Sequence, residues 1–483
     1  MPRRKWYLAL GALLMRIAPL HRYRARIAAL ERELDDALHR DRLTGLANRL
    51  LFMERLREAI ERVRGGRQKM LAVLFLDFDR FKVVNDAMGH QAGDELLVHM
   101  AGRLRESLHG GATAAGCGNQ IARFGGDEFL MLLNDVERAA DAVLVAERLL
   151  TALSQPCRIH GREVGTPASI GVVASGQAVE DAATLVRNAD LAMYEAKRAG
   201  RGCAVLFNDA MHARLARHLT IESGLREALG TSQLSLVYQP IVDLETGRRS
   251  SVEALVRWNH PALGAISPSE FVPIAEESGL IVPLGEWVMR ESCAALARWR
   301  RRDPRRAPAV ISVNISRAEL AQGARLLRLV RDTLQEAGLP PESLQLEVTE
   351  REVMRDPAAT LALMHELRAI GVRLAMDDFG TGTSSLGCLR EYPFDVIKVD
   401  RSFIHGVTEG PDQLAVIHAT ITLVENLGKS SVGEGVETAE QLAILQSLGC
   451  HYAQGHFLGA PMAESELVDT EQTLTVPRLR LLG

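Results

Sequence analysis

The alternation of apolar and polar segments over residues 41–208 predicts a mixed α/β domain. A continuous apolar run such as Leu71–Phe78 is typical of a buried strand. Two apolar runs on either side of Gly125-Gly126 predict a hairpin. The expected elements are a strand at Leu71–Phe78, a helix through Leu96, Leu97, Met100 and Leu104, a hairpin within Ile121–Leu133, a strand at Ala168–Val173 and a helix at Ala182–Ala199.

Farther along the chain, from about residue 222, strand-like runs alternate with helical stretches. Eight such units in about 250 residues are the count and length of a (β/α)8 barrel. The candidate strands are Leu236–Val242, Val252–Trp258, Ala309–Ser316, Leu344–Glu350, Val372–Phe379, Val396–Asp400, Ser431–Val436 and Tyr452–Phe457. Residues 208–222 are polar and helical without a Gly/Ser/Pro run, so we place the domain junction there, as a continuous helix.

The first 40 residues predict a helical arm. Leu20, Ile27 and Leu34 recur every seven residues within 20–41, which favours a dimerising coiled coil over a helix docked on its own domain. The apolar stretch Trp6–Met15 is too short to span a bilayer, which needs roughly 20 residues. A helix packed on a partner, a peripheral membrane anchor and a frayed tail remain open for residues 6–15.

Charge and cysteine content narrow the class of protein. A formal charge of −4 argues against a protein that coats nucleic acid. The six cysteines are scattered without a CxxC pair, which argues against disulfides or a zinc site and fits the cytoplasm, with or without contact to the inner face of its membrane. Only six of 57 basic residues are Lys, so a retained Lys can mark a site that needs a compact ammonium.

Polar residues fall in or at the ends of the predicted barrel strands. Barrel enzymes collect their active sites at the C-terminal ends of the strands, whereas buried charges kept for packing alone are costly. Carboxylate and amide oxygens suit Mg²⁺ or Mn²⁺, and two such ions suit hydrolysis of a phosphodiester. The residues are Glu253, Asn314, Glu347, Asp377, Asp378, Lys398, Asp400, Glu434 and Gln454.

A second acidic site is predicted in the first domain. Asp77 closes a buried strand, and Gly125-Gly126-Asp127-Glu128 forms a tight turn. If the two strands are neighbours, Asp77 and Asp127 converge, and paired acids beside exposed backbone amides would hold Mg²⁺ and a triphosphate. The glycine pair alone carries little information, because hairpin turns use such pairs routinely.

Residues 41–208 resemble a GGDEF domain, the catalytic module of diguanylate cyclases. The motifs are Asp41-Arg42-Leu43-Thr44-Gly45-Leu46-Ala47-Asn48-Arg49, Leu76–Lys82 with Asn85-Asp86, Gly89–Asp94, Arg123–Phe129, Ala168–Gly171 and Tyr194–Arg201. The resemblance implies that two GTP molecules, one on each of two facing domains, condense to cyclic di-GMP, and hence a homodimer.

The same resemblance implies a role for each matching residue. Asp77, Asp127 and the carbonyl of Phe78 would bind metal, and Asp127 or Glu128 would help deprotonate the attacking hydroxyl. Asn85 and Asp94 would bind guanine, and Lys197 and Arg201 would hold the phosphates. Product-inhibited members carry Arg-x-x-Asp before the glycine pair; Gly116-Cys117-Gly118-Asn119 stands there, so we expect no inhibitory site. Gly202 replaces the family's usual Asn, at a peripheral position.

Residues 219–470 resemble an EAL domain, a barrel that hydrolyses cyclic di-GMP to linear pGpG. The signature is Glu253-Ala254-Leu255 with Val256-Arg257-Trp258. The other motifs are Tyr238-Gln239-Pro240, Ser267–Ala275, Ser312–Ser316, Glu347–Glu350, Asp377–Gly382, Ile397–Asp400, Glu434–Glu437 and Gln454-Gly455. Every acidic position of the family's motifs is present.

This second resemblance implies a two-metal site. Glu253, Asn314, Glu347 and Asp377 would bind one ion, and Asp377 with Asp378 a second. Lys398 would orient or activate the water, and Glu434 would act as base or second-metal ligand. Gln454 would support the site, Arg257 would contact a substrate phosphate, and Glu350 would hold the loop after Asp378. Thr383 replaces the family's usual Tyr in that loop, which we expect to tune activity.

Three functions follow from the two resemblances. The first is a bifunctional enzyme that makes and breaks cyclic di-GMP, because every residue required at each site is present. The second is a phosphodiesterase whose GGDEF domain binds GTP only as a regulator, because sequence does not show the dimer geometry that a cyclase needs. The third is a non-catalytic cyclic di-GMP receptor, a class that usually loses acidic ligands.

Overall fold

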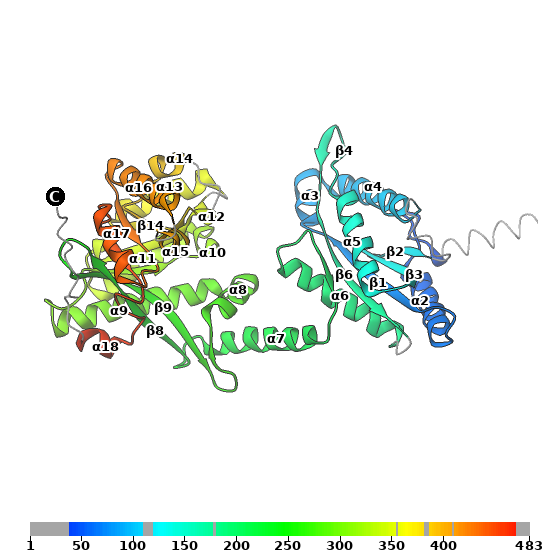
Figure 1. Ribbon diagram of the computed structural model, residues 1–483, viewed down its shortest axis with the longest axis horizontal. Helices are drawn as coiled ribbons and strands as arrows, with labels where there is room; N and C mark the ends of the chain where they lie inside the picture. The colour runs from blue at the N-terminus through cyan, green and yellow to red at the C-terminus, as the bar shows by residue number, and fades with distance from the viewer. Residues whose placement is uncertain are drawn as a thin grey trace, which may run out of the picture. The chain divides into compact units, whose positions relative to one another are not determined.

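The computed structural model describes residues 38–109, 119–176, 180–353, 356–380, 386–407 and 410–469 (Figure 1). The chain divides into two compact units, residues 1–216 and 217–483. Trp6–Met15, residues 20–37 of the predicted coiled coil, Gly116–Gly118 and Thr383 lie outside the described residues. In the described part, no helix has the length and hydropathy to cross a membrane.

The first unit is built on a five-stranded sheet with the order β2-β3-β1-β6-β7. The central strand β1 (Met70–Phe78) pairs antiparallel with β3 (Glu128–Val136) and with β6 (Ala168–Ser175). The predicted hairpin is confirmed, because β2 (Gln120–Gly125) pairs with β3 across the glycine turn. The remaining strands are β7 (Ala204–Leu206), parallel to β6, and the separate pair β4 (Cys157–Ile159) and β5 (Arg162–Val164).

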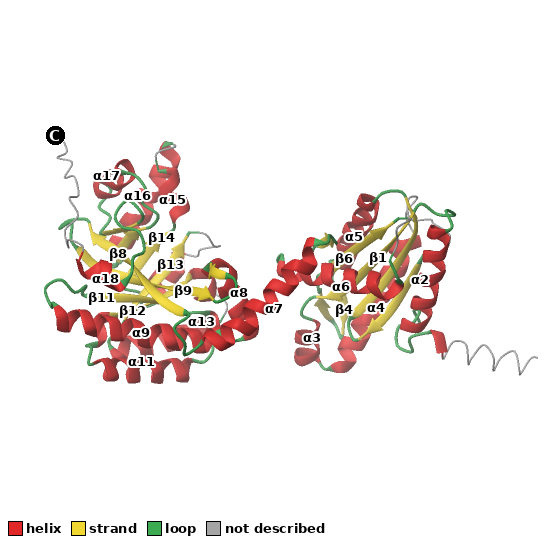
Figure 2. Ribbon diagram, turned by 90° about the horizontal axis from the view of Figure 1, so that it is seen from below, coloured by secondary structure: helices red, strands yellow, loops and turns green. Residues whose placement is uncertain are grey.

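Helices cover both faces of this sheet (Figure 2). Alternate side chains of a strand point to opposite faces. Leu74 and Leu76 of β1 accordingly belong to one buried cluster, with α4 and α5, whereas Val73 and Phe75 belong to another, with α2 and α6. The helices are α2 (Arg49–Arg64), α3 (Phe81–Met88), α4 (His90–His109), α5 (Ala139–Leu153) and α6 (Ala182–Arg198).

The second unit is a closed barrel. Its sheet has the order β10-β9-β11-β12-β13-β14-β15-β16-β8, and β8 also pairs with β9. The strands are β8 (Leu234–Asp243), β9 (Arg249–His260), β10 (Gly264–Ile266), β11 (Val310–Asn314), β12 (Leu344–Thr349), β13 (Arg373–Phe379), β14 (Val396–Val399), β15 (Ser430–Gly433) and β16 (Tyr452–Gln454).

The predicted eight-stranded barrel is confirmed, with one difference in strand direction. Strand β8 runs antiparallel to both neighbours, β9 and β16. A short turn, not a crossover helix, joins β8 to β9, and two strands joined by a short turn must be antiparallel. The others, from β9 and β11 to β16, pair parallel, so their C-terminal ends meet at one end of the barrel.

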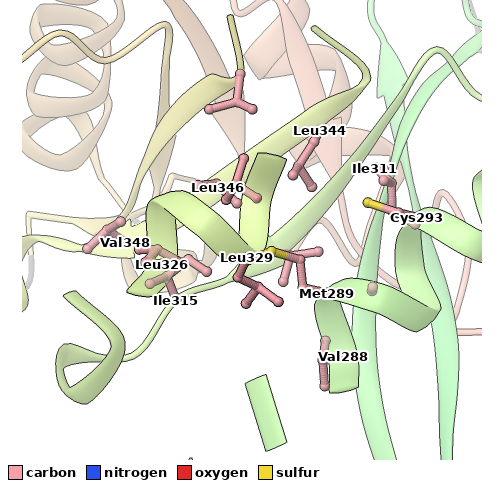
Figure 3. Packing of buried hydrophobic residues seen from close by; sticks show 14 of the residues in the cluster. Val288, Met289, Cys293, Ile311, Ile315, Leu326, Leu329, Leu344, Leu346 and Val348 are labelled. Atoms are coloured by element: carbon pink, nitrogen blue, oxygen red, sulfur yellow. The ribbon is translucent and has the colours of Figure 1, made fainter. Parts of the chain in front are cut away.

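Helices pack on the outside of the barrel strands. Figure 3 shows side chains of α9, such as Met289, against β11 and β12, such as Ile311 and Leu346. The helices and the single 3-10 turn η1 are α8 (Pro268–Ser278), α9 (Ile281–Arg302), α10 (Arg317–Leu320), α11 (Gly323–Ala337), η1 (Pro341–Ser343), α12 (Glu350–Val353), α13 (Pro357–Ile370), α14 (Leu386–Glu391), α15 (Arg401–Gly406), α16 (Pro411–Asn426), α17 (Ala439–Ser447) and α18 (Glu464–Asp469). Strands buried on both faces explain the continuous apolar runs of the sequence.

Of the predicted junction at residues 208–222, residues 210–222 belong to one helix, α7 (Ala210–Ala228). A Cβ built on Gly224 of α7 would lie 2.8 Å from the His260 ring, so glycine allows this helix to pack closely on β9. A continuous helix, not a flexible linker, therefore occupies the boundary between the two units.

Candidate functional sites

Lys398 of β14 lies among four carboxylates at the C-terminal end of the barrel. Its Nζ is 2.6 Å from Glu347 Oε2, 2.7 Å from Glu434 Oε1, 3.1 Å from Asp377 Oδ1 and 3.5 Å from Glu253 Oε2. The Lys398 side chain is 1% exposed, so its ammonium is shielded from solvent. We call Lys398 and these four carboxylates the Lys398 cluster. The structure thus brings together five residues predicted from five separate strands.

One ammonium does not balance four carboxylates. Burial alone would lower the pKa of Lys398, but the surrounding carboxylates raise it well above its ordinary value. Burial raises the pKa of Glu347 to about 7 and that of Glu434 to about 8, although Lys398 opposes both shifts. The site therefore favours additional positive charge, as a divalent cation would supply.

Glu253 differs from the other carboxylates, because side-chain amides surround it. Asn314 Nδ2 donates to Oε1 at 2.7 Å, and Gln454 Nε2 donates to Oε2 at 2.8 Å. Burial would raise the pKa of Glu253, but Lys398 and these two amides outweigh it and hold the pKa below its usual value. Glu253 is therefore held ionised, with both oxygens oriented.

Two glutamines complete the polar network. Gln239 Oε1 accepts from Gln454 Nε2 at 3.0 Å, and Gln345 Nε2 donates to Glu347 Oε1 at 3.0 Å. The sequence motif that contains Gln239 implied no role for it, and sequence reasoning missed Gln345. The signal for Gln345 is its position two residues before Glu347, which puts both side chains on the same face of β12.

Asp377, Asp378 and Glu434 form the group best placed to hold a metal ion. One oxygen of each lies within 4.8 Å of the others, and we call this group the acid triplet. Adjacent residues of a regular strand point to opposite faces. Asp378 instead has φ 53°, a left-handed conformation that Asp tolerates, and it lies with Asp377 on the site.

Glu350 contacts the backbone shortly after Asp378. Its Oε2 lies 3.5 Å from the backbone nitrogen of Gly380, two residues after Asp378. Glu350 is buried and begins α12, directly after β12. The contact is long, but it joins the two segments that the predicted loop-support role requires.

A cavity of about 760 Å³ opens above this site. Glu253, Asp378, Glu434 and Gln454 are among its lining residues. Arg257 lies four residues after Glu253 on β9 and on the same face, but it does not belong to the lining. Its guanidinium donates to the carbonyl of Val256 at 2.9 Å, so its predicted phosphate contact requires a different side-chain conformation.

The site of the first unit forms where β1 and β3 pair. Asp77 is opposite Glu128 in the register, and Asp127 precedes Glu128 in the turn. Lys197 Nζ, from α6, lies 2.7 Å from Asp77 Oδ1. Burial raises the pKa of Asp77 although Lys197 opposes it, and burial, then Asp190, raises the pKa of Glu128. The prediction that Asp77 and Asp127 converge required β1 and β3 to be neighbours, and they are.

Asp190 of α6 was not predicted as a site residue. It lies seven residues before Lys197, which places both on one face of the helix. Burial raises the pKa of Asp190, and its charge acts on Glu128. The signal for Asp190 in the sequence was its helical spacing from Lys197.

The predicted guanine-binding pair lies on α3 and α4. A Cβ on Gly93 would lie 1.9 Å from Asn85 Oδ1, so Asn85 packs against the residue before Asp94. Asn85 Oδ1 is buried and has no hydrogen-bond partner among the described residues, while Asp94 is exposed. An unsatisfied acceptor beside an exposed carboxylate suits a ligand that carries N–H donors, as guanine does.

Phe78 is the last residue of β1, and Arg201 lies near Asp79, which follows it. Arg201 Nε is 3.9 Å from Asp79 Oδ1, and Asp79 Oδ2 accepts from the backbone of Gly202 at 3.1 Å. Gly202 has φ 62°, a conformation that Gly and Asn favour, which explains why either residue suits this position. The Phe78 side chain is fully buried, so only its backbone is available as a ligand.

Arg123 braces the glycine turn. Its Nε and Nη2 donate to the carbonyl of Gly126 at 2.9 and 2.7 Å, and its Nη1 lies 3.3 Å from Asp41 Oδ1. Asp41 in turn accepts from the backbone and hydroxyl of Thr44 at 2.8 and 2.7 Å. The motif that begins at Asp41 thus fixes the turn that presents Asp127.

Two family models match the chain. The model described as "Diguanylate cyclase, GGDEF domain" matches residues 38–203, and that described as "EAL domain" matches residues 222–461. A relative from Pseudomonas aeruginosa, "Bifunctional diguanylate cyclase/cyclic di-GMP phosphodiesterase MucR", is 42% identical over 443 residues, which cover 92% of this chain and 63% of the relative.

A second relative and a solved structure also align with at least 90% of this chain. "Cyclic di-GMP phosphodiesterase NbdA" from Pseudomonas aeruginosa is 38% identical over 469 residues, which are 95% of this chain and 58% of the relative. The S helix-GGDEF-EAL structure of Vibrio cholerae LapD, bound to c-di-GMP, aligns with TM-score 0.53 at 19% identity over 90% of this chain and 99% of that one. That last similarity concerns the fold alone.

Both relatives are longer than this chain, which spans 63% and 58% of their lengths. The matched regions nevertheless include both acidic sites and the order of the two domains. The chain belongs to the family of proteins in which a GGDEF domain is followed by an EAL domain.

Proposed function

We propose that the protein both makes and breaks cyclic di-GMP. The GGDEF domain condenses two GTP molecules, and the EAL domain hydrolyses cyclic di-GMP to pGpG. The observation that carries this proposal is that both acid sets are complete and converge, around Lys398 in the barrel and around Asp77 and Asp127 in the first unit. The similarity to a relative named as bifunctional supports it.

At the barrel site, the acid triplet together with Glu253, Asn314 and Glu347 would hold two Mg²⁺ or Mn²⁺ ions, whose chemistry is to stabilise phosphoryl charge and to acidify a bound water. Glu434 either completes the ligands of the second ion or receives the proton of the attacking water, and a pKa raised to about 8 suits the second task. Lys398 orients that water, and its charge opposes the rise in pKa that burial causes at Glu347 and Glu434.

At the GGDEF site, Asp77, Asp127 and the carbonyl of Phe78 would hold Mg²⁺ with GTP. Lys197 and Arg201 bind the phosphates, and Asn85 and Asp94 bind guanine. Glu128 or Asp127 accepts the proton of the attacking 3′-hydroxyl. Two copies of the domain must face each other, so we propose that the active cyclase is a homodimer.

One observation favours a second candidate function. NbdA, similar over 95% of this chain, is named only as a phosphodiesterase. In this alternative the GGDEF domain binds GTP as a regulator of the barrel. A purely receptor function is less well supported, because none of the acidic residues of the barrel site is missing.

Separate inactivation of the two domains tests the proposal. The Glu253→Ala variant, incubated with Mg²⁺ and GTP, should form cyclic di-GMP, because the barrel can no longer remove the product. The Asp127→Ala variant should convert added cyclic di-GMP to pGpG at the wild-type rate. Chromatography of the nucleotides measures both products, and the double variant serves as the control that should do neither.

The two assays separate the three candidate functions. If Glu253→Ala forms no cyclic di-GMP while Asp127→Ala still forms pGpG, the protein is a regulated phosphodiesterase and not a bifunctional enzyme. A failure of both variants, with cyclic di-GMP still bound, would leave only the receptor function.

The brace at Arg123 predicts a selective loss of cyclase activity. Arg123→Ala removes two hydrogen bonds to the Gly126 carbonyl and the ion pair with Asp41. We expect the cyclase rate to fall about 10–100-fold, the loss expected for hydrogen bonds from a charged group. The phosphodiesterase rate of the same preparation is the internal control and should not change; an equal loss of both activities would point to general unfolding.

A further inference from the structure

Two arginines line the barrel cavity without a role in the Lys398 cluster or the acid triplet. Arg351 lies on α12 and Arg401 begins α15. Both side chains are exposed, and neither makes a hydrogen bond or ion pair with any residue that the structure describes. These exposed guanidinium groups at the rim of an acidic cavity are available to an anionic ligand.

The order of the strands places these arginines on either side of Asp377 and Asp378, two members of the acid triplet. Arg351 follows β12 and Arg401 follows β14, whereas β13 between them carries Asp377 and Asp378. Arg351 and Asp378 both line the cavity. Arg351 therefore faces one side of the site at which the proposed reaction takes place.

Arg401 is fixed close to the third member of the triplet. A Cβ built on Gly435 would lie 2.5 Å from Arg401 Cβ, so the backbone after Glu434 packs directly on Arg401. Asp400 caps the first turn of α15 by accepting from the backbone of Ser402 at 3.0 Å, which holds the start of this helix. Arg401 is thus held beside Glu434 while its guanidinium remains exposed.

The charged residues that line the cavity limit where the two phosphate groups of a substrate can lie. Six carboxylate groups line the cavity, and Arg351 and Arg401 are the only Lys or Arg residues among the described lining residues. The phosphodiester that is cleaved must lie over the acid triplet, which would hold the metal ions that offset its charge. The other phosphodiester of a cyclic dinucleotide would meet carboxylates and be repelled unless a cation received it.

We propose that Arg351 and Arg401 form a subsite for the phosphodiester that is not cleaved. The planar guanidinium offers paired N–H donors that match phosphate oxygens, which an ammonium cannot reproduce. The inference rests on the proposed phosphodiesterase function and deepens it: the subsite selects substrates that carry two phosphodiesters over those that carry one.

Two substrates separate this role from a role in the chemical step. Arg351→Ala and Arg401→Ala should each raise KM for cyclic di-GMP about 10–100-fold, the loss of a hydrogen bond to a charged group, while kcat changes less than about threefold. With bis(p-nitrophenyl) phosphate, which has a single phosphodiester, kcat/KM should stay within about twofold of wild type. Arg→Lys variants should recover only part of the affinity.

The matched control is Arg331→Ala, because Arg331 is an exposed residue of α11 outside the cavity. This variant should have wild-type KM and kcat with both substrates. An equal loss with both substrates would overturn the inference and assign the arginines to the reacting phosphate. Unchanged kinetics with both would also overturn it.

Hydrolysis of cyclic di-GMP by the wild-type protein tests the phosphodiesterase proposal separately from the arginine subsite. If wild type does not hydrolyse cyclic di-GMP, the phosphodiesterase proposal fails by itself. Calorimetric binding of cyclic di-GMP in Mg²⁺ then decides the subsite. A weaker affinity of both arginine variants, with Arg331→Ala unchanged, supports it; equal affinities, or no binding by wild type, overturn it.

Discussion

Replacing Lys398 with Met is expected to abolish the phosphodiesterase activity and to destabilise the barrel. The substitution keeps the length of the side chain but leaves four carboxylates, two buried and two partly buried, without their shared cation. Breaking a buried ion pair in this way costs about 3–5 kcal/mol of the free energy of unfolding. The loss of a preorganised charge at the reacting atoms should lower kcat by about 10³-fold.

Thermal unfolding with and without Mg²⁺ measures the first effect, and pGpG formation the second. Mg²⁺ should raise the melting temperature of Lys398→Met more than that of wild type, because the unpaired carboxylates gain a cation that binds only the folded state. Lys82→Met, at an exposed lysine of α3, is the control and should stay within about 0.5 kcal/mol of wild type. Retention of activity within tenfold by Lys398→Met would remove Lys398 from the catalytic machinery.

A single methyl group at Gly455 is expected to disable the same site without touching a charged residue. A Cβ at this position would lie 2.2 Å from both the nitrogen and the oxygen of Val436, so the backbone must move. Gly455 follows Gln454, which orients Glu253, and Val436 follows Glu434 by two residues. The displacement should therefore reach two site residues at once.

We expect Gly455→Ala to lower kcat about 10²-fold, as displacements near 1 Å do, and to cost about 1–3 kcal/mol by overpacking. Gly410→Ala is the matched control, because a Cβ at Gly410 meets nothing within 4 Å and its φ of 177° suits any residue. Steady-state kinetics and chemical unfolding give both quantities. Wild-type kinetics for Gly455→Ala would show that the chain relaxes there without moving Gln454.

Much of the site could be predicted because its residues lie in strongly patterned segments. The apolar runs that end in Glu347, Asp377 and Lys398 identified buried strands, and parallel strands of a barrel present their C-terminal ends together. The scarcity of lysine was informative for Lys398 and Lys197, which both contact carboxylates. It was not informative for Lys429, which donates to the backbone carbonyls of Tyr392 and Phe394.

Other features depended on the backbone conformation at single residues. The two-residue period of a strand predicts that Asp377 and Asp378 face opposite ways, and only the left-handed φ of Asp378 brings both to the site. The antiparallel direction of β8 likewise depends on the short turn that follows it, which the alternation of strands and helices did not reveal.

The sequence by itself determined the order of the two domains, the strand ends that carry acids and the family to which the chain belongs, because periodicity and motifs are local properties. Only the tertiary structure decided which of these acids share Lys398, that Gln345 and Asp190 join the sites, and that Arg351 and Arg401 flank Asp377 and Asp378. Distances between strands far apart in the chain depend on register, barrel closure and side-chain packing, and no local pattern encodes them.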